Sequence, residues 1–259
     1  MNNIKLALIG CDGFVGSALA RYLKDDKYID LSLVNRSNYE LYKGLQFDVL
    51  IDAACNSKKY VADLDPLDEA QQSIIHKLET LVLFKAKFHI HISSVDVYPN
   101  LSDTSQTRED TQINISSCSN YGAHKYIAEL LVHHYATNWI IFRLSGMVGP
   151  GLKKNPVYDI SNGNPIYIHP NSMYQYCSTD YVARVIWSIY KNGKFNQVYN
   201  IAGNGGVSPR MISKIMEKNL LISDDLKVNV PRIVNVNNYK LSQLFHLQDS
   251  IQVIKEYLK

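Results

Sequence analysis

A glycine-rich turn after the first apolar segment constrains this chain most. Residues 4–9 form a short apolar run, glycines follow in the pattern G-x-x-G-x-x-G, and helical spacing of apolar residues begins within that turn. A strand, a tight turn and a helix N-terminus offer free N–H groups and close backbone approach to a pyrophosphate. Taken alone, the spacing also fits a purely structural turn. In its context it predicts a dinucleotide-binding turn made by Gly10, Gly13, Phe14, Val15 and Gly16.

Candidate strands and helices alternate along the rest of the chain. Strands are expected at 31–34, 48–52, 89–93, 139–143 and 198–202, and helices at 14–23, 68–84, 121–135, 180–190, 208–221 and 249–258. This alternation predicts an α/β fold with a doubly wound parallel sheet, as in Rossmann domains. Only 13 residues separate Val34 from Asp48, which leaves room for one short crossover and no extra strand–helix unit.

Beyond Pro150 the composition changes. Residues 151–171 are rich in Pro, Asn, Gly and Lys, which predicts an irregular segment. The helix and strand expected between residues 173 and 203 indicate a return to the sheet. We therefore expect a dinucleotide-binding domain over residues 1–150, joined by 173–203, and a small C-terminal substrate-binding lobe over 151–172 and 204–259.

Composition and charge exclude several classes of protein. With 46% apolar residues and a net charge of +3, the chain is expected to be globular rather than disordered. No apolar run suits a membrane span, and the start of the chain lacks the pattern of a secretory signal. Lysines and arginines are scattered, so no nucleic-acid partner is expected. The four cysteines lie far apart, which favours free thiols in the cytoplasm over a disulfide framework or a zinc site.

The end of the second expected strand indicates which dinucleotide binds. An acidic residue there would suit the ribose of NAD, but the chain has Asn35, Arg36 and Ser37. An arginine and a hydroxyl group suit the 2′-phosphate of NADP. The alternative is a solvated loop arginine.

The sequence Tyr121-Gly-Ala-His-Lys125 places a phenol and an ammonium group on one face of a helix. A nearby ammonium is expected to lower the tyrosine pKa and to make Tyr121 an acid/base group near neutral pH. Ser94 follows a strand at the edge of the sheet where ligands bind and is placed to hydrogen-bond a carbonyl oxygen. With 18 tyrosines in the chain, a surface Tyr–Lys pair is the alternative.

The glycine turn, D-V-L-I-D-A-A, S-S-V-D-V-Y, Y-G-A-H-K and R-L-S-G-M-V-G-P occur in this order. Together they resemble the extended short-chain dehydrogenase/reductase superfamily, nearest to its sugar-nucleotide epimerases, dehydratases and 4-ketoreductases. The resemblance implies that Tyr121 is the acid/base, that Lys125 holds the nicotinamide ribose and that Ser94 is the catalytic hydroxyl, which touches substrate. It also implies a homodimer and a cofactor that lies along Ala53, Ala54 and Leu144. Arg210 or Arg232 would hold the pyrophosphate of the substrate. The alternative is that each of these arginines forms a surface salt bridge.

Departures from the family pattern narrow the function. Val95 stands at a position where the dehydratases of this group have an acidic residue. Elimination of water needs that acid, so the sequence disfavours a dehydratase. Asp96 aligns with an extra acid/base of fucose-type epimerase-reductases, and the alternative is that it caps local backbone N–H groups. The family pattern has an asparagine at two positions where this chain differs. Ser73 stands at the one on the helix after Pro66, and Gly146 stands at the other.

His89 and His91 share one face of a strand, but no further ligands at metal-binding spacing accompany them, so no metal is expected. The sequence as a whole predicts an NADP-dependent reductase of a nucleotide-activated 4-keto-6-deoxy sugar. Two alternatives stay open. One is a nucleotide-sugar 4-epimerase with retained NAD or NADP, and the other is a non-catalytic, cofactor-sensing relative.

Overall fold

The computed structural model describes residues 3–226 and 230–259. The chain forms two compact units. The first contains residues up to Pro99, residues 112–144 and residues 182–199, and the second contains residues 100–111, 145–181 and 200–259. No helix among the described residues is long and apolar enough to cross a membrane.

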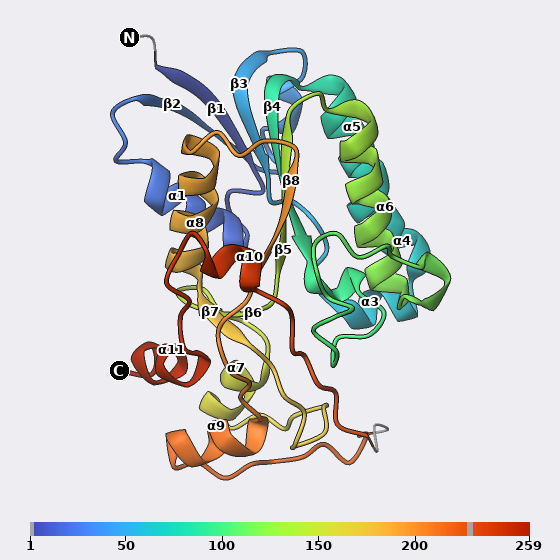
Figure 1. The fold of residues 1–259 in the computed structure, drawn as a ribbon, viewed down its shortest axis with the longest axis vertical. Helices are drawn as coiled ribbons and strands as arrows, with labels where there is room; N and C mark the ends of the chain where they lie inside the picture. The colour runs from blue at the N-terminus through green and yellow to red at the C-terminus, as the bar shows by residue number, and fades with distance from the viewer. Residues whose placement is uncertain (1–2, 227–229) are drawn as a thin grey trace. The chain divides into compact units, whose positions relative to one another are not determined.

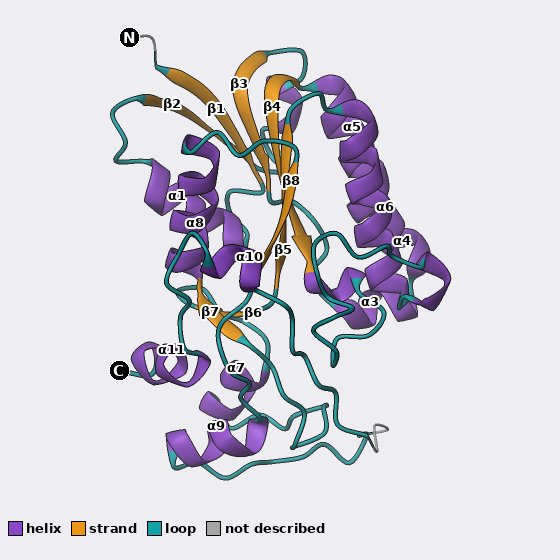
Figure 2. Cartoon of the chain, viewed as in Figure 1, coloured by secondary structure: helices purple, strands orange, loops and turns teal. Residues whose placement is uncertain are grey.

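A six-stranded sheet forms the centre of the first unit (Figure 2). Its strands, in spatial order, are β2 (Ile29–Val34), β1 (Ile4–Ile9), β3 (Gln46–Asp52), β4 (Lys85–Ser94), β5 (Trp139–Leu144) and β8 (Gln197–Ile201). The first five pair in parallel. Helices α1 (Phe14–Leu23) and α8 (Thr179–Lys191) cover one face, and α5 (His76–Leu83) and α6 (Asn120–Tyr135) cover the other (Figure 1). The predicted doubly wound parallel sheet is confirmed.

The central strands are apolar on both faces, as a doubly covered sheet requires. Leu6, Leu8 and Ile51 are completely buried. The crossover from β2 to β3 contains only α2 (Tyr39–Tyr42), as its 13-residue length predicts. Tyr39 anchors this short helix, because its ring packs on Phe84 and its hydroxyl lies 2.9 Å from the hydroxyl of Thr80.

The long helix predicted over 68–84 is three contiguous segments. They are α4 (Pro66–Ala70), a π-helical turn η1 (Gln71–Ile75) and α5. The side chain of Asp65 caps the start by accepting a hydrogen bond from the Asp68 N–H. Two further elements before β4 and α6 were not expected from the sequence, namely α3 (Lys59–Leu64) and the short 3-10 turn η3 (Ile115–Ser117).

The second unit is built from short elements. Its two-stranded parallel sheet consists of β6 (Gly146–Val148) and β7 (Tyr176–Ser178), and its helices are α7 (Pro156–Ser161), α9 (Pro209–Met216), α10 (Tyr239–Ser242) and α11 (Ser250–Tyr257). Ser208 caps α9 as predicted, accepting from the Met211 N–H. The helix ends at Met216 rather than 221, because Glu217 adopts a left-handed conformation with φ of 53°. The segment predicted to be irregular contains α7, capped by Asn155.

Candidate active site

The glycine turn joins β1 to α1 and leaves no room for side chains. Gly10 has φ of +76°, a conformation that favours glycine, and its N–H donates to the Val34 carbonyl at 2.9 Å. A Cβ on Gly16 would lie 2.0 Å from the Gly10 carbonyl oxygen. The first turn of α1 has no acidic residue, and Gly13 caps it without a side chain. Free N–H groups and positive dipole therefore face the turn, a geometry that suits a phosphate group.

The residues after β2 form a compact polar turn. The Asn35 side chain donates to Asp12 at 2.8 Å and accepts from both the backbone N–H and the hydroxyl of Ser37. Arg36 is exposed and has no ion pair with any described residue. Arg36 therefore belongs to a turn that contacts the glycine turn through Asn35 and Asp12, and no ion pair compensates its charge among the described residues.

A buried ion pair lies where β3 ends. Asp52 pairs with Lys77 of α5, and both side chains are buried. Burial lowers the pKa of Lys77, while the carboxylate of Asp52 opposes that shift. The other Asp52 oxygen accepts from the Ala54 N–H at 3.0 Å. The backbone of Ala53 and Ala54 packs closely against Gly10, since a Cβ on Gly10 would lie 2.7 Å from the Ala54 nitrogen. The pair thus fixes the backbone opposite the glycine turn.

Ser94, Asp96 and Tyr121 meet at the carboxyl end of β4. Ser94 is its last residue, and the turn η2 (Val95–Val97) follows. The Ser94 hydroxyl donates to an Asp96 carboxylate oxygen at 3.3 Å and is also hydrogen-bonded to Tyr121. Asp96 forms an ion pair with Lys59 of α3, a residue that the sequence analysis did not single out. The Asp96 carboxylate is therefore held by side chains. The backbone cap at this turn is made by Ser94, whose hydroxyl oxygen accepts from the Asp96 N–H at 3.2 Å.

The pKa of Tyr121 is raised well above its usual value, and the predicted lowering is wrong. Burial is the largest cause, followed by the electrostatic effects of Cys55, Asp96 and Glu69, and the hydrogen bond with Ser94 only partly opposes them. The Lys125 ammonium lies 5.2 Å from the centroid of the tyrosine ring rather than at its hydroxyl. Tyr121 is consequently a protonated phenol at neutral pH in this structure.

Lys125 lies within a buried polar network. Its Nζ donates to the Ser73 hydroxyl at 3.4 Å, and Ser73 donates to Glu69 at 2.5 Å. The second oxygen of Glu69 contacts Nδ1 of His124. Glu69 was not predicted, although it precedes Ser73 by four residues on the same helical rod, and His124 lies inside the Y-x-x-x-K motif.

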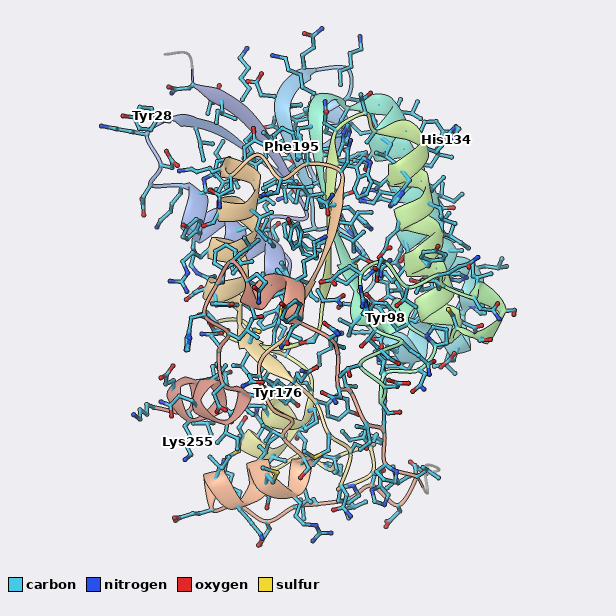
Figure 3. All side chains as sticks on the ribbon, viewed as in Figure 1. Tyr28, Tyr98, His134, Tyr176, Phe195 and Lys255 are labelled. Carbon is cyan, nitrogen blue, oxygen red and sulfur yellow. The ribbon has the colours of Figure 1, made fainter. Side chains whose placement is uncertain are left out.

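A second buried glutamate fixes α6 against the sheet. Glu129 accepts from Ser93 at 2.5 Å and from two nitrogens of Arg143, the shorter distance being 2.7 Å. Arg143 also donates to the hydroxyl of Tyr98 at 2.8 Å, and Tyr98 is labelled in Figure 3. This network ties β4, β5 and α6 together and so orients Tyr121 and Lys125 toward the end of β4.

The remaining predicted site residues lie in different places. Leu144 is buried at the end of β5, in register with Ser94. Arg210 and Arg232 belong to the second unit. Arg210 donates to the Asn171 side chain at 3.1 Å, and the backbone N–H of Arg232 donates to the Ser172 hydroxyl at 2.9 Å. The structure thus groups the first-unit residues around the carboxyl edge of the sheet.

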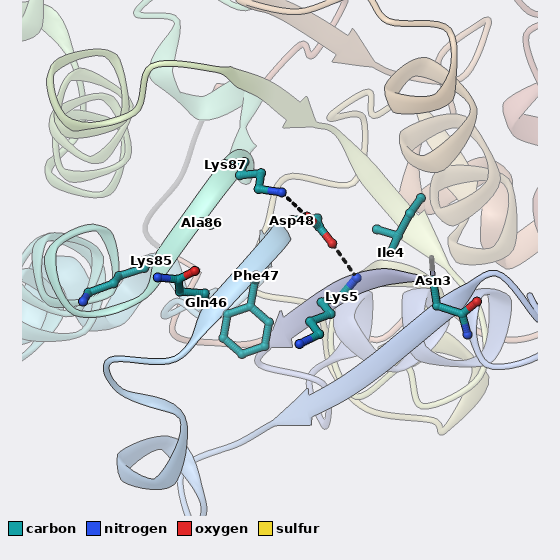
Figure 4. Close-up of a pocket in the computed structure, with 9 residues that line it drawn as sticks. All are labelled: Asn3, Ile4, Lys5, Gln46, Phe47, Asp48, Lys85, Ala86 and Lys87. Carbon is teal, nitrogen blue, oxygen red and sulfur yellow. Dashed lines mark hydrogen bonds and ion pairs between the residues drawn. The ribbon is translucent and has the colours of Figure 1, made fainter. Parts of the chain in front are cut away.

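His89 and His91 are buried, and their ring nitrogens have no hydrogen-bond partner among the described residues. Burial lowers the pKa of both, to about 4 for His89. Within residues 3–226 and 230–259, no group of three metal-binding side chains comes together. A hollow of about 720 Å³ lies at the opposite edge, where β1, β3 and β4 begin (Figure 4). Parallel sheets bind ligands at their carboxyl edge, so this hollow is not the candidate active site.

Comparison with known proteins adds a family and a fold. Residues 6–202 match the NAD dependent epimerase/dehydratase family. The structure is similar to a mutant UDP-glucuronic acid 4-epimerase from Bacillus cereus in complex with UDP-4-deoxy-4-fluoro-glucuronic acid and NAD, with TM-score 0.77 and 18% identity over 98% of this chain and 96% of that one. It is also similar to dTDP-4-dehydrorhamnose reductase from Bacillus anthracis str. Ames in complex with NADP, with TM-score 0.78 and 14% identity over 100% and 98%. No curated protein sequence matches the chain significantly.

Proposed function

The chain belongs to the NAD dependent epimerase/dehydratase family, and we propose that it is an NADP-dependent reductase of a nucleotide-activated 4-keto-6-deoxy sugar. Membership confirms the family resemblance of the motifs and the expectation of an NAD(P)-dependent enzyme. The observation that carries the proposal is the grouping of Ser94, Tyr121 and Lys125 at the end of β4, at the same edge of the parallel sheet as the glycine turn after β1.

The glycine turn fits a dinucleotide. Its backbone closes so tightly that Gly16 has no space for a Cβ, and the start of α1 presents N–H groups without a competing carboxylate. Ala53, Ala54 and Leu144 would line the path to the nicotinamide, and Lys125 would hold its ribose. A bound nicotinamide cofactor would supply the hydride for carbonyl reduction.

Arg36 supports NADP as the cofactor. Its guanidinium is exposed next to the Asn35–Ser37 turn, where a 2′-phosphate would gain a charge-assisted contact. Asn35 is engaged with Asp12 and Ser37, which leaves Arg36 as the group that distinguishes the two cofactors. NAD remains the cofactor expected if Arg36 contributes nothing.

Ser94 and Tyr121 divide the chemistry at the carbonyl. The Ser94 hydroxyl would hydrogen-bond the keto oxygen and polarise it. Tyr121 would then give its proton to the oxygen as hydride reaches the carbon. Burial raises the pKa of Tyr121, so the phenol carries its proton before the transfer. Asp96, paired with Lys59, would orient Ser94 through its hydrogen bond rather than donate a proton.

A nucleotide-sugar 4-epimerase is the second candidate. The same three side chains would serve an enzyme that removes and returns a hydride without releasing its cofactor, and one similar structure is an epimerase holding NAD. Elimination of water is disfavoured because Val95 offers no acid beside Ser94. In either case Arg210 and Arg232 are the proposed contacts of the second unit with the substrate pyrophosphate. We also propose a cytoplasmic homodimer.

The test is a titration with NADPH and NADH, followed by nicotinamide absorbance with a panel of nucleotide-linked 4-keto-6-deoxy sugars. Net oxidation of NADPH by one sugar supports the reductase. Tightly retained cofactor, with 4-epimerisation and no net oxidation, supports the epimerase. Firm binding of cofactor with neither reaction supports the non-catalytic relative.

A further inference from the structure

We propose that Lys59 and Gly122 are positioning residues that hold the η2 turn from two sides. They thereby set the spacing between the hydroxyls of Ser94 and Tyr121, which are hydrogen-bonded to each other. The inference rests on the proposed function, in which both hydroxyls act on one carbonyl oxygen. Ser94 ends β4 and Tyr121 lies in the first turn of α6, so their spacing depends on how η2 is held against α6.

Lys59 holds η2 through the side chain of Asp96. That side chain is only 9% exposed, and it forms an ion pair with the ammonium group of Lys59, the first residue of α3. The same carboxylate oxygen of Asp96 accepts from the Ser94 hydroxyl at 3.3 Å. Because one atom makes both contacts, the position of Lys59 determines where the acceptor for the Ser94 hydroxyl lies.

Contacts at both ends hold α3 in place. Asn56 is buried and fixes its start, since the Asn56 side chain accepts from the Lys58 N–H at 2.9 Å and donates to the Lys58 carbonyl at 3.1 Å. Near the other end, the side chain of Asn120 donates to the Ala62 carbonyl at 3.4 Å. Asn120 is the first residue of α6, and α3 packs beside that helix (Figure 1). The backbone that carries Lys59 is thus attached to α6.

Gly122 holds η2 from the other side because it has no side chain. A Cβ on Gly122 would overlap the backbone carbonyl oxygen of Asp96. Glycine is unfavourable inside a helix, so helix formation does not explain its presence one residue after Tyr121. The overlapping atom belongs to the backbone, and a side chain at this position would therefore push η2, and Ser94 with it, away from α6.

The alternative for Lys59 is an ordinary surface ion pair. Its side chain is 41% exposed, and exposed pairs contribute little. The buried carboxylate of Asp96, shared with Ser94, distinguishes this pair from a surface pair. The neighbouring Lys58 differs, because its ammonium lies over the Tyr60 ring, 5.9 Å from the centroid. The two adjacent lysines therefore form a matched pair for an experiment.

The central experiment measures turnover of Lys59→Met in the full-length protein, with NADPH and whichever panel sugar the wild type reduces. We expect kcat to fall about tenfold, because a misplaced Ser94 polarises the carbonyl poorly, while the Kd for NADPH stays unchanged. Lys59→Arg keeps a cation within reach of Asp96 and should retain most of the wild-type kcat. Lys58→Met is the control and should turn over like the wild type.

A double-mutant cycle separates an effect through Asp96 from a general structural effect of Lys59. Asp96→Asn alone should lower kcat about as much as Lys59→Met does. If Lys59 acts through that carboxylate, the double variant should lose no more than either single variant, whereas independent losses would multiply.

Gly122→Ala tests the other side of the turn. It should lower kcat about tenfold by moving Ser94, again without a change in the Kd for NADPH. Circular dichroism establishes that each variant is folded.

Wild-type kcat in a folded Lys59→Met or Gly122→Ala variant overturns the inference and leaves the proposed function intact. Losses that multiply in the double variant, or equal losses in Lys59→Arg and Lys59→Met, overturn it as well. If the wild type epimerises a sugar instead of reducing it, the same variants are compared in that reaction, since it uses the same two hydroxyls. A wild type without either reaction overturns the proposed function and the inference with it.

Discussion

Lys77 pairs with Asp52 beneath the turn that follows β3, and the two side chains are only 3% and 4% exposed. Removing one partner of such a pair leaves an uncompensated buried charge. We therefore expect Lys77→Met to lower the free energy of unfolding by about 3–5 kcal/mol, measured by urea denaturation. The displaced Asp52 should also loosen Ala54 and weaken NADPH binding.

The exposed pair of Lys87 and Asp48 is the matched control for that loss (Figure 4). The Lys87 side chain is 81% exposed, so water screens its charge. Lys87→Met should change the free energy of unfolding by about 1 kcal/mol at most. Equal effects of the two substitutions would contradict the importance of burial at Asp52.

Tyr121→Phe should abolish turnover, with a loss of roughly 100-fold or more in kcat, while the Kd for NADPH stays nearly unchanged. Because the pKa of Tyr121 is raised, the phenol of the free enzyme stays protonated through neutral and mildly basic pH. The wild-type kcat/KM for reduction should therefore remain level there and fall only at strongly basic pH. Tyr135→Phe, at the exposed end of α6, is the control and should retain full turnover.

Arg36→Ser tests the choice of cofactor. Loss of a charge-assisted contact to a 2′-phosphate should weaken NADPH binding about tenfold and leave NADH binding unchanged. Fluorescence titration with both cofactors measures the two constants in one preparation. An equal loss for NADPH and NADH would show that Arg36 acts on the turn rather than on the phosphate.

His89 should make the protein less stable in mild acid. Burial lowers its pKa from 6.5 to about 4, so between these values the unfolded chain binds a proton that the folded chain does not. Stability therefore falls as the pH drops through this window. From about pH 7 to about pH 5, the wild type should lose about 2 kcal/mol more than His89→Phe does in urea denaturation. Parallel pH dependences of the two proteins would refute the assignment.

Features with a local cause were predictable from the sequence. The glycine turn depends on backbone space within seven residues, and the order of strands and helices follows from the period of apolar residues. The short crossover through α2 follows from chain length alone. These features fix the edge of the sheet where the predicted residues of the first unit gather.

Features that depend on distant contacts were not predictable. Strand β7 is three residues long, and its Tyr176 N–H donates to the hydroxyl of Ser250 at 2.9 Å, a partner 74 positions away. Proximity of Lys125 to Tyr121 suggested a lowered pKa, yet burial and neighbouring negative charge decide its direction. The Tyr176–Ser250 hydrogen bond and the pKa of Tyr121 both depend on which surfaces the folded chain buries. The spacing of apolar residues along the sequence does not reveal those surfaces.

The π-helical turn η1 makes the geometry of the site depend on the number of residues between Glu69 and Lys77. It lies between Glu69, which contacts His124 of α6, and Lys77, which pairs with Asp52 at the end of β3. Each residue of an α-helix advances the side-chain direction by about 100°. Deleting one residue from Gln71–Ile75 would straighten the rod into a regular helix and swing Glu69 away from His124 while Lys77 stays in place. The deletion of one residue would therefore separate Glu69 from its contact with α6, although Glu69, His124 and Lys77 are all retained.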